Sequence, residues 1–117
     1  MGKLTGKATI RTDGNVLATE NGATLNVGGI QRQGERHGGR SYYKEEEANP
    51  SMECMVLHGK DTDIIALSDI TGATVEFETD TGQTFILRGA FTTESMALDT
   101  GTGKSALKME ADSVDRV

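Results

Sequence analysis

The segment Gly101-Thr-Gly-Lys-Ser105 has residue types that bind nucleotide phosphates, because glycine amides and a lysine can surround phosphate oxygens. The complete phosphate-binding pattern requires a glycine five positions before Gly103, and that position holds Leu98. It also requires a helix after the loop, whereas the residues after Ser105 alternate like a strand. We therefore expect a hairpin loop here and not a nucleotide site.

Asp61-Thr-Asp63 begins like a calcium-binding loop, but the pattern fails at its later positions. Position 6, a glycine in such loops, is Ala66, and position 12, a glutamate, is Gly72. Capping of a helix explains these acidic residues better. Asn49-Pro50-Ser51 fails as a glycosylation acceptor because proline is excluded from its middle position, so we interpret it as a turn.

The nucleophilic and basic side chains do not form a catalytic pattern. Cys54 lies in the middle of an apolar strand-like segment and is interpreted as a buried structural thiol, in keeping with a reducing compartment. His37 and His58 lack a carboxylate at a spacing that predicts a dyad, and with one cysteine they do not make a zinc site. We expect no enzyme activity, no catalytic residues, no cofactor and no metal.

Length and composition favour one small domain covering residues 1–117. Isoleucine, leucine, valine and phenylalanine make up about 20% of the 117 residues, so the core must be thin. The formal net charge is −6, and residues 53–117 hold five basic and twelve acidic side chains. Such a surface repels a phosphate backbone. The sequence also contains no apolar run of the roughly 18 residues that a membrane helix needs.

Short segments with alternating apolar and polar residues recur and predict an antiparallel β-sandwich or barrel. The clearest is 73–79, which a turn at 80–82 joins to 83–91 as a hairpin. Its expected cross-strand pairs join Val75 and Phe77 to Phe85 and Leu87. Further strands are expected at 7–12, 24–27, 51–58, 95–98 and 105–112. Three of these segments, 7–12, 24–27 and 105–112, have apolar residues that are expected to point inward. They are Ala8, Ile10, Leu25, Val27, Leu107, Met109 and Ala111.

Two segments depart from simple alternation. In 51–58, Met52, Cys54 and Val56 share one face while Met55 and Leu57 share the other, so we expect both faces to be covered. The second cover is either the domain's own helix or a neighbouring subunit, and the sequence does not decide between them. One short helix is expected over residues 61–70, capped by Asp61 or Thr62, with Ile64, Ile65 and Leu67 as its apolar stripe.

Residues 28–50 are expected to form a long charged arm without an apolar face. Its basic residues Arg32, Arg36, Arg40 and Lys44 fall four apart, but Gly34, Gly38 and Gly39 argue against a helix. A connection of this length is typical of a functional or partner-bound segment. Tyr42 and Tyr43 can supply contact area, and Glu45, Glu46 and Glu47 form an acidic end. A thin core and an arm together favour self-assembly through exposed strand edges and through the arm.

Three phrases of the sequence carry a resemblance that covers nearly the whole chain. They are Leu17-Ala-Thr-Glu-Asn-Gly-Ala-Thr-Leu-Asn-Val-Gly-Gly29, Glu35-Arg-His-Gly-Gly-Arg40 and Ile70-Thr-Gly-Ala-Thr-Val-Glu-Phe-Glu-Thr-Asp-Thr-Gly-Gln83. In this order they closely resemble the tail tube proteins of Mu-like contractile-tailed phages and prophages.

That resemblance implies six copies per ring and rings stacked into the hollow inner tube of a virion tail, assembled in the bacterial cytoplasm. The implied partners are further copies of the chain and the sheath, tape-measure, baseplate and terminator proteins. DNA would pass through the lumen without specific binding, because six chains carry a formal charge of about −36. The candidate lumen acids are Glu76, Glu78, Glu110 and Asp112. The expected inter-subunit or inter-ring residues are Arg32, Glu35, Arg36, Arg40, Tyr42, Tyr43, Lys44, Glu45, Glu46 and Glu47.

Other functional classes remain open at this point. The inner-tube protein of a type VI-like contractile secretion system would share the fold and the ring, with specific contacts in its lumen. A monomeric ligand-binding β-barrel would need a deep apolar pocket, which a chain with three phenylalanines and no tryptophan can hardly line. An enzyme has no support beyond the incomplete phosphate loop.

Overall fold

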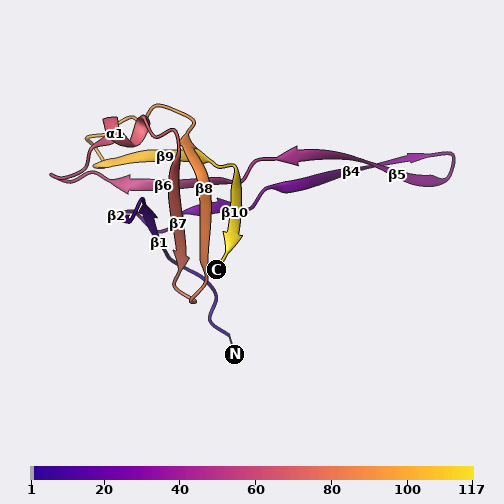
Figure 1. Cartoon of the computed structure of the whole chain (residues 1–117), viewed down its shortest axis with the longest axis horizontal. Coiled ribbons are helices and arrows are strands. Elements are labelled where there is room, and N and C mark those ends of the chain that lie inside the picture. The colour runs from indigo at the N-terminus through magenta and orange to yellow at the C-terminus, as the bar shows by residue number, and fades with distance from the viewer. Residues whose placement is uncertain (1) are drawn as a thin grey trace.

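The computed structural model describes residues 2–117 as a strand-rich body from which one long hairpin projects (Figure 1). The described chain contains ten strands and one helix. In chain order they are β1 (Ala8–Thr12), β2 (Asn15–Leu17), β3 (Thr24–Asn26), β4 (Gly29–His37), β5 (Arg40–Ala48), β6 (Ser51–Leu57), α1 (Ile64–Ser68), β7 (Ala73–Thr79), β8 (Thr84–Thr92), β9 (Lys104–Glu110) and β10 (Ser113–Arg116).

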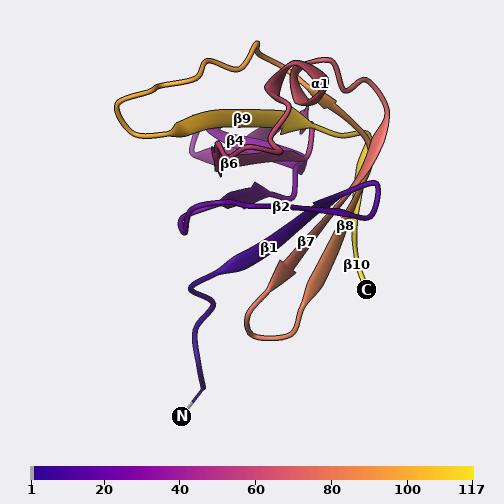
Figure 2. The same cartoon turned by 90° about the vertical axis from the view of Figure 1, so that its left-hand side faces the viewer.

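The body is an antiparallel sandwich, as the alternation predicts. Its strands follow the order β2-β1-β7-β8-β9-β6-β3, and β10 adds to β8. Strand β8 belongs to both layers, because residues between Thr84 and Ala90 pair with β7 and β10, whereas Phe91 and Thr92 pair with β9. Figure 2 shows the two layers. In the first layer β1, β7 and β8 run in a different direction from β9 and β6 of the second layer.

The core lies between these layers and matches the predicted inward faces. Val75 pairs with Leu87 and Phe77 with Phe85, which confirms the hairpin predicted from residues 73–91. Both layers contribute side chains that are almost wholly buried. They are Ile10, Val75, Phe77 and Leu87 from the first layer and Met52, Cys54, Val56, Leu107 and Met109 from the second.

The helix is shorter than predicted. It spans Ile64–Ser68 instead of 61–70, and its N-cap is Asp63, not Asp61 or Thr62. The Asp63 carboxylate accepts hydrogen bonds from the backbone N–H groups of Ile65 and Ala66, each at 3.1 Å. Only one residue of the expected stripe, Leu67, is buried, while Ile65 is 75% exposed. The helix therefore closes one end of the core and leaves an apolar side chain in solvent.

Two details of the predicted strands are wrong, and of the two covers left open for the outer face of 51–58 the helix is excluded. Residues 95–98 do not form a strand but cross over the body as an irregular segment between β8 and β9. Val27 lies outside β3 and is 55% exposed, so it does not point inward as expected. The outer face of β6 is not covered by the chain's own helix, since Met55 is 37% and Leu57 39% exposed.

The arm is a regular two-stranded hairpin, which alternation did not predict. Strands β4 and β5 form a sheet of their own, and Figure 1 shows it extending away from the body. The turn is Gly38-Gly39, where both residues have positive φ, +57° and +80°. A two-residue turn with this geometry matches the twist of paired strands and requires glycine-like residues. The four-residue spacing of the basic side chains thus belongs to a hairpin and not to a helix.

Candidate functional site

The segments with possible chemistry take structural roles. Residues 100–103 form a turn across which Asp99 and Lys104 are bridged, and the strand β9 follows where the phosphate-binding pattern requires a helix. Cys54 is 4% exposed, and burial raises the pKa of its thiol to about 12. A thiol so rarely ionised is a poor nucleophile, which supports its interpretation as a structural residue.

Residues 2–117 contain no group of three or more histidine, cysteine, aspartate or glutamate side chains placed to hold a metal ion. His37 is exposed in the arm and lies 3.3 Å from Glu35, and His58 follows the end of β6. Among these described residues, no helix is long and apolar enough to cross a membrane.

The surfaces that remain are suited to contact with other molecules, and the arm is the largest of them. Its register places Arg32 opposite Glu45 and Glu35 opposite Tyr42. The Arg32 Nε and a Glu45 carboxylate oxygen lie 3.6 Å apart, and Lys44 Nζ lies 3.3 Å from Glu35. These two ion pairs hold the middle of the arm together across its strands.

The arm exposes large side chains that a solitary hairpin does not cover. Ile30 and Tyr42 are each 52% exposed, and Tyr43 is 65% exposed. The His37 and Tyr42 rings lie beside each other, with centroids 6.2 Å apart. Aromatic and isoleucine side chains are favourable contact residues when a partner buries them.

The junction of the arm with the body is a close approach of two backbone segments at Gly28. Gly28 has a φ of +67°, and a Cβ atom there would lie 2.6 Å from both the Ala48 carbonyl oxygen and the Pro50 nitrogen. The Asn26 side chain accepts a hydrogen bond from the Gly28 N–H at 2.9 Å. The two segments of the chain that enter and leave the arm are therefore in contact at a point where only glycine fits.

The four candidate lumen acids do not form one cluster. Glu76 and Glu78 lie on the outer side of β7, where Arg11 Nη1 is 3.8 Å and 2.6 Å from their respective carboxylates. The hydrogen bond to Glu78 raises the pKa of Arg11. Glu110 ends β9 opposite Phe91, and Asp112 is an exposed residue just beyond it. The structure thus divides these acids between two parts of the body.

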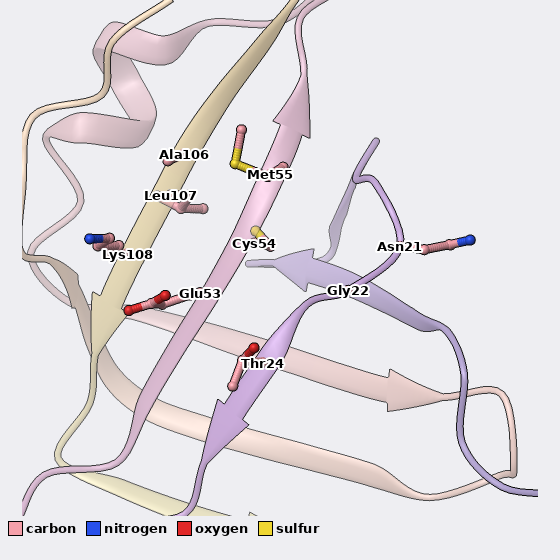
Figure 3. Close-up of a pocket in the computed structure, with 9 residues that line it drawn as sticks. All are labelled: Asn21, Gly22, Thr24, Glu53, Cys54, Met55, Ala106, Leu107 and Lys108. Carbon is pink, nitrogen blue, oxygen red and sulfur yellow. The ribbon is translucent and has the colours of Figure 1, made fainter.

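A further exposed surface lies on the outer side of β6 and β9. Met55 pairs with Ala106 and Glu53 with Lys108 across these strands. Together with Asn21 and Thr24 they border a shallow depression of about 240 Å³ (Figure 3). The sequence signalled this surface through the second apolar face of 51–58, and the single chain leaves it uncovered.

Comparisons with known proteins agree with this picture of a small β-sandwich with contact surfaces. Residues 1–116 match the family described as phage tail tube protein. The Mu-like prophage FluMu tail tube protein of Haemophilus influenzae is 41% identical over 113 residues, which cover 96% of this chain and 94% of the relative. The tail tube protein of Escherichia phage Mu is 33% identical over 97 residues, covering 82% and 81%.

Solved structures share the fold at low sequence identity. A chain of the PVC sheath/tube terminator, from an extracellular contractile injection system in the extended state, has a TM-score of 0.70 at 12% identity, covering 100% of this chain and 97% of that one. A chain of the anti-feeding prophage tube-terminating cap has a TM-score of 0.70 at 10% identity, covering 100% and 91%.

The fold is therefore shared with chains from an extracellular contractile injection system and from the anti-feeding prophage. By sequence, the chain belongs to the phage tail tube protein family. It is a structural component of a Mu-like phage tail, in a family that is not enzymatic.

Proposed function

We propose that six copies of the chain form a ring and that the rings stack into the hollow inner tube through which phage DNA is ejected. Family membership supports the tube, and the arm supports assembly through neighbours. Both arm strands have nine residues, yet they pair only with each other within the described chain. An isolated two-stranded hairpin is marginally stable in water. Its side chains gain most when another copy covers them.

The arm is the proposed inter-subunit or inter-ring element, and its exposure is the observation that carries the proposal. Ile30, Tyr42 and Tyr43 would be buried against the adjacent copy, with the charged residues around them setting the register. The uncovered face of β6, with Met55 and Leu57, would be a second contact within the ring. This arrangement would replace the intramolecular cover that the thin core lacks.

The lumen is proposed to repel DNA. The arm carries four basic and four acidic side chains, so the net charge of −6 comes from the body. Glu76, Glu78, Glu110 and Asp112 would place part of that charge on the inner wall and keep DNA phosphates from adhering.

The two locations of these acids make the lumen proposal testable. Glu76→Lys with Glu78→Lys is compared with Glu110→Lys alone, in assembled tubes incubated with short labelled DNA. The variant that alters the lumen should retain DNA that a nuclease cannot digest, whereas a change on the outer wall should retain only digestible DNA. Tubes of both variants that retain no protected DNA would contradict the assignment of these acids to the lumen.

The partners of the tube are proposed to be the sheath, the tape-measure protein, the baseplate and the terminator. The chains that share this fold come from structures described as sheath/tube terminator, tube-terminating cap and baseplate, which supports contacts of this kind. Assembly would take place in the host cytoplasm before the tail is complete. The phage tail is preferred to a secretion-system tube because both relatives above are phage or prophage tail tube proteins.

Electron microscopy of the purified protein at rising concentration, with light-scattering mass, tests the proposal. Sixfold rings or hollow tubes are the expected result. A strict monomer at every concentration, in the presence of a baseplate-like nucleus as well as without it, would contradict the proposed function. Rings with a different symmetry would correct the number of copies and leave the tube in place.

A further inference from the structure

The charged residues of the arm divide into those with a partner in the same chain and those without one. In the middle of the arm, Arg32 pairs with Glu45 and Lys44 with Glu35. Four other charged arm residues make no ion pair within the described chain: Arg36, Arg40, Glu46 and Glu47. Two cations and two anions are therefore left over.

These four residues lie at opposite ends of the arm. Arg36 and Arg40 flank the Gly38-Gly39 turn, and we call them the arm tip. Glu46 and Glu47 lie next to the body, and we call them the arm base. Arg40 and Glu46 are six residues apart on β5, which is about 20 Å of extended strand. Because the screening length at physiological salt is about 8 Å, the tip and base of one arm barely attract each other.

Because side chains alternate along a strand, each face of the arm carries one of the two cations and one of the two anions that make no ion pair. Directly opposed residues share a face, so Arg36 lies on the same face as Arg32, Glu45 and Glu47. Arg40 lies on the other face with Glu46. Each face thus has a cation at the tip and an anion at the base, with an internally paired segment between them.

We propose that the arm tip of one copy docks on the arm base of a second copy, so that Arg36 and Arg40 meet Glu47 and Glu46. This inference rests on the proposed function, and it names the contact through which the arms act. Two parallel arms displaced by about 20 Å bring each tip to the base of the next and leave the paired middle segments free of conflict. A contact of tip to base is heterologous, so it continues from copy to copy instead of closing into a dimer.

Complementarity favours another arm over the body as the partner of the tip. The leftover charges match in number and in their distribution over the two faces, and their sum is zero. Tyr42 and Tyr43 lie between tip and base on β5 and are exposed. They are two and three residues from Arg40, about 7 to 10 Å of strand, so they lie beside the tip-to-base contact, which charge alone carries.

Charge exchange tests this contact. The tip variant carries Arg36→Glu and Arg40→Glu, the base variant carries Glu46→Arg and Glu47→Arg, and the fourfold variant carries all of them. A control exchanges an ion pair of the body, outside the proposed contact surfaces, through Arg88→Asp and Asp115→Arg. Circular dichroism and thermal unfolding confirm that each body is folded, and sedimentation velocity together with microscopy measures self-association at about 0.05 to 0.5 M NaCl.

The tip and base variants should each raise the concentration needed for self-association by at least about tenfold. The fourfold variant should return to within about threefold of the unaltered protein, with the same salt dependence, because it restores tip-to-base attraction with the signs reversed. The control should associate like the unaltered protein.

Failure of the fourfold variant to recover would overturn the inference, because the charges would then meet groups outside the arms. So would tip and base variants that associate normally, or association that ends at a dimer. If rings form equally well in all variants, the tube proposal stands and the tip-to-base contact is wrong. If tip-to-base association occurs without rings, the contact stands and the ring proposal is wrong. A protein that never self-associates would contradict both.

Discussion

The body and the arm are stabilised by different means. In the body, Ile10, Val75, Leu87 and Leu107 have no exposed surface, so the core is held by burial within one chain. In the arm, residues 29–47 are nearly all exposed, and the strands are held by their ladder and two ion pairs. The radius of gyration is 17.0 Å, against about 13 Å for a compact chain of this length. The difference shows that burial within one chain stabilises the body, whereas the arm extends from the body without such cover.

The largest test of this contrast places the same charge in each region. Val75→Asp buries a carboxylate in a fully enclosed site and should cost about 4–5 kcal/mol or more, which is comparable with the whole stability of a small domain. Tyr43→Asp should change the free energy of unfolding by less than about 0.5 kcal/mol, because Tyr43 is 65% exposed. Denaturant unfolding measures both. A stable Val75→Asp body would show that burial does not govern this region.

A smaller effect is expected at the junction of the two regions. Gly28→Ala puts a Cβ atom 2.6 Å from two backbone atoms at a φ of +67°, which should cost about 1–3 kcal/mol and turn the arm away from its direction. Gly34→Ala is the control, since a Cβ there meets nothing within 4 Å. Thermal unfolding and small-angle scattering, with the 17.0 Å radius as reference, would report stability and arm direction separately. Equal behaviour of the two variants would mean that the junction does not aim the arm.

A weaker effect of opposite sign is expected inside the body. The Ser105 hydroxyl is buried and has no hydrogen-bond partner among residues 2–117. Ser105→Ala should therefore stabilise the body by about 0.5–1 kcal/mol, because it removes an unsatisfied polar group. Ser41→Ala in the exposed arm should be neutral. Chemical denaturation that shows a loss of stability for Ser105→Ala would reveal a hydrogen bond that this geometry does not contain.

The smallest effect concerns the N-terminal segment. A hydrogen bond from the Gly6 N–H at 3.1 Å, together with Lys3 Nζ at 3.6 Å, lowers the pKa of Asp80 below its usual value. The folded state therefore binds this proton less readily than the unfolded state. The resulting stabilisation is present above about pH 4 and is lost as pH falls through the lowered pKa. Asp80→Asn should flatten the stability profile between about pH 5 and pH 3, and an unchanged profile would exclude the contribution of Asp80.

Sequence periodicity predicted the body because burial imposes it. Residues 73–91 and 105–112 alternate, and the apolar residues assigned inward from this pattern include Val75, Phe77, Leu87, Leu107 and Met109, which are buried in the structure. The short strands β2 and β10 carry too few residues for a period to be read. Residues 95–98 also alternate, but they pair with no strand in the structure. The sequence of a single segment does not reveal whether a partner strand is available.

The hairpin in the arm escaped prediction for the same physical reason. No face of β4 or β5 is buried in the single chain, so no apolar alternation was selected there. The Gly38-Gly39 pair was the available signal, since it suits a two-residue turn. The residues proposed for contact were found by composition, but their pairing required the register that sets Arg32 against Glu45 and leaves Arg36 and Glu47 apart.

The reactivity of the single buried thiol, Cys54, reports how often the body opens. Cys54 is the single cysteine, and in the closed core it is screened from reagents and hardly ionised. A thiol reagent will therefore modify the chain only when the sandwich separates, at a rate that follows the opening equilibrium. Labelling of free chains and of assembled tubes would measure how much a neighbour slows that opening, with no substitution needed to introduce a thiol.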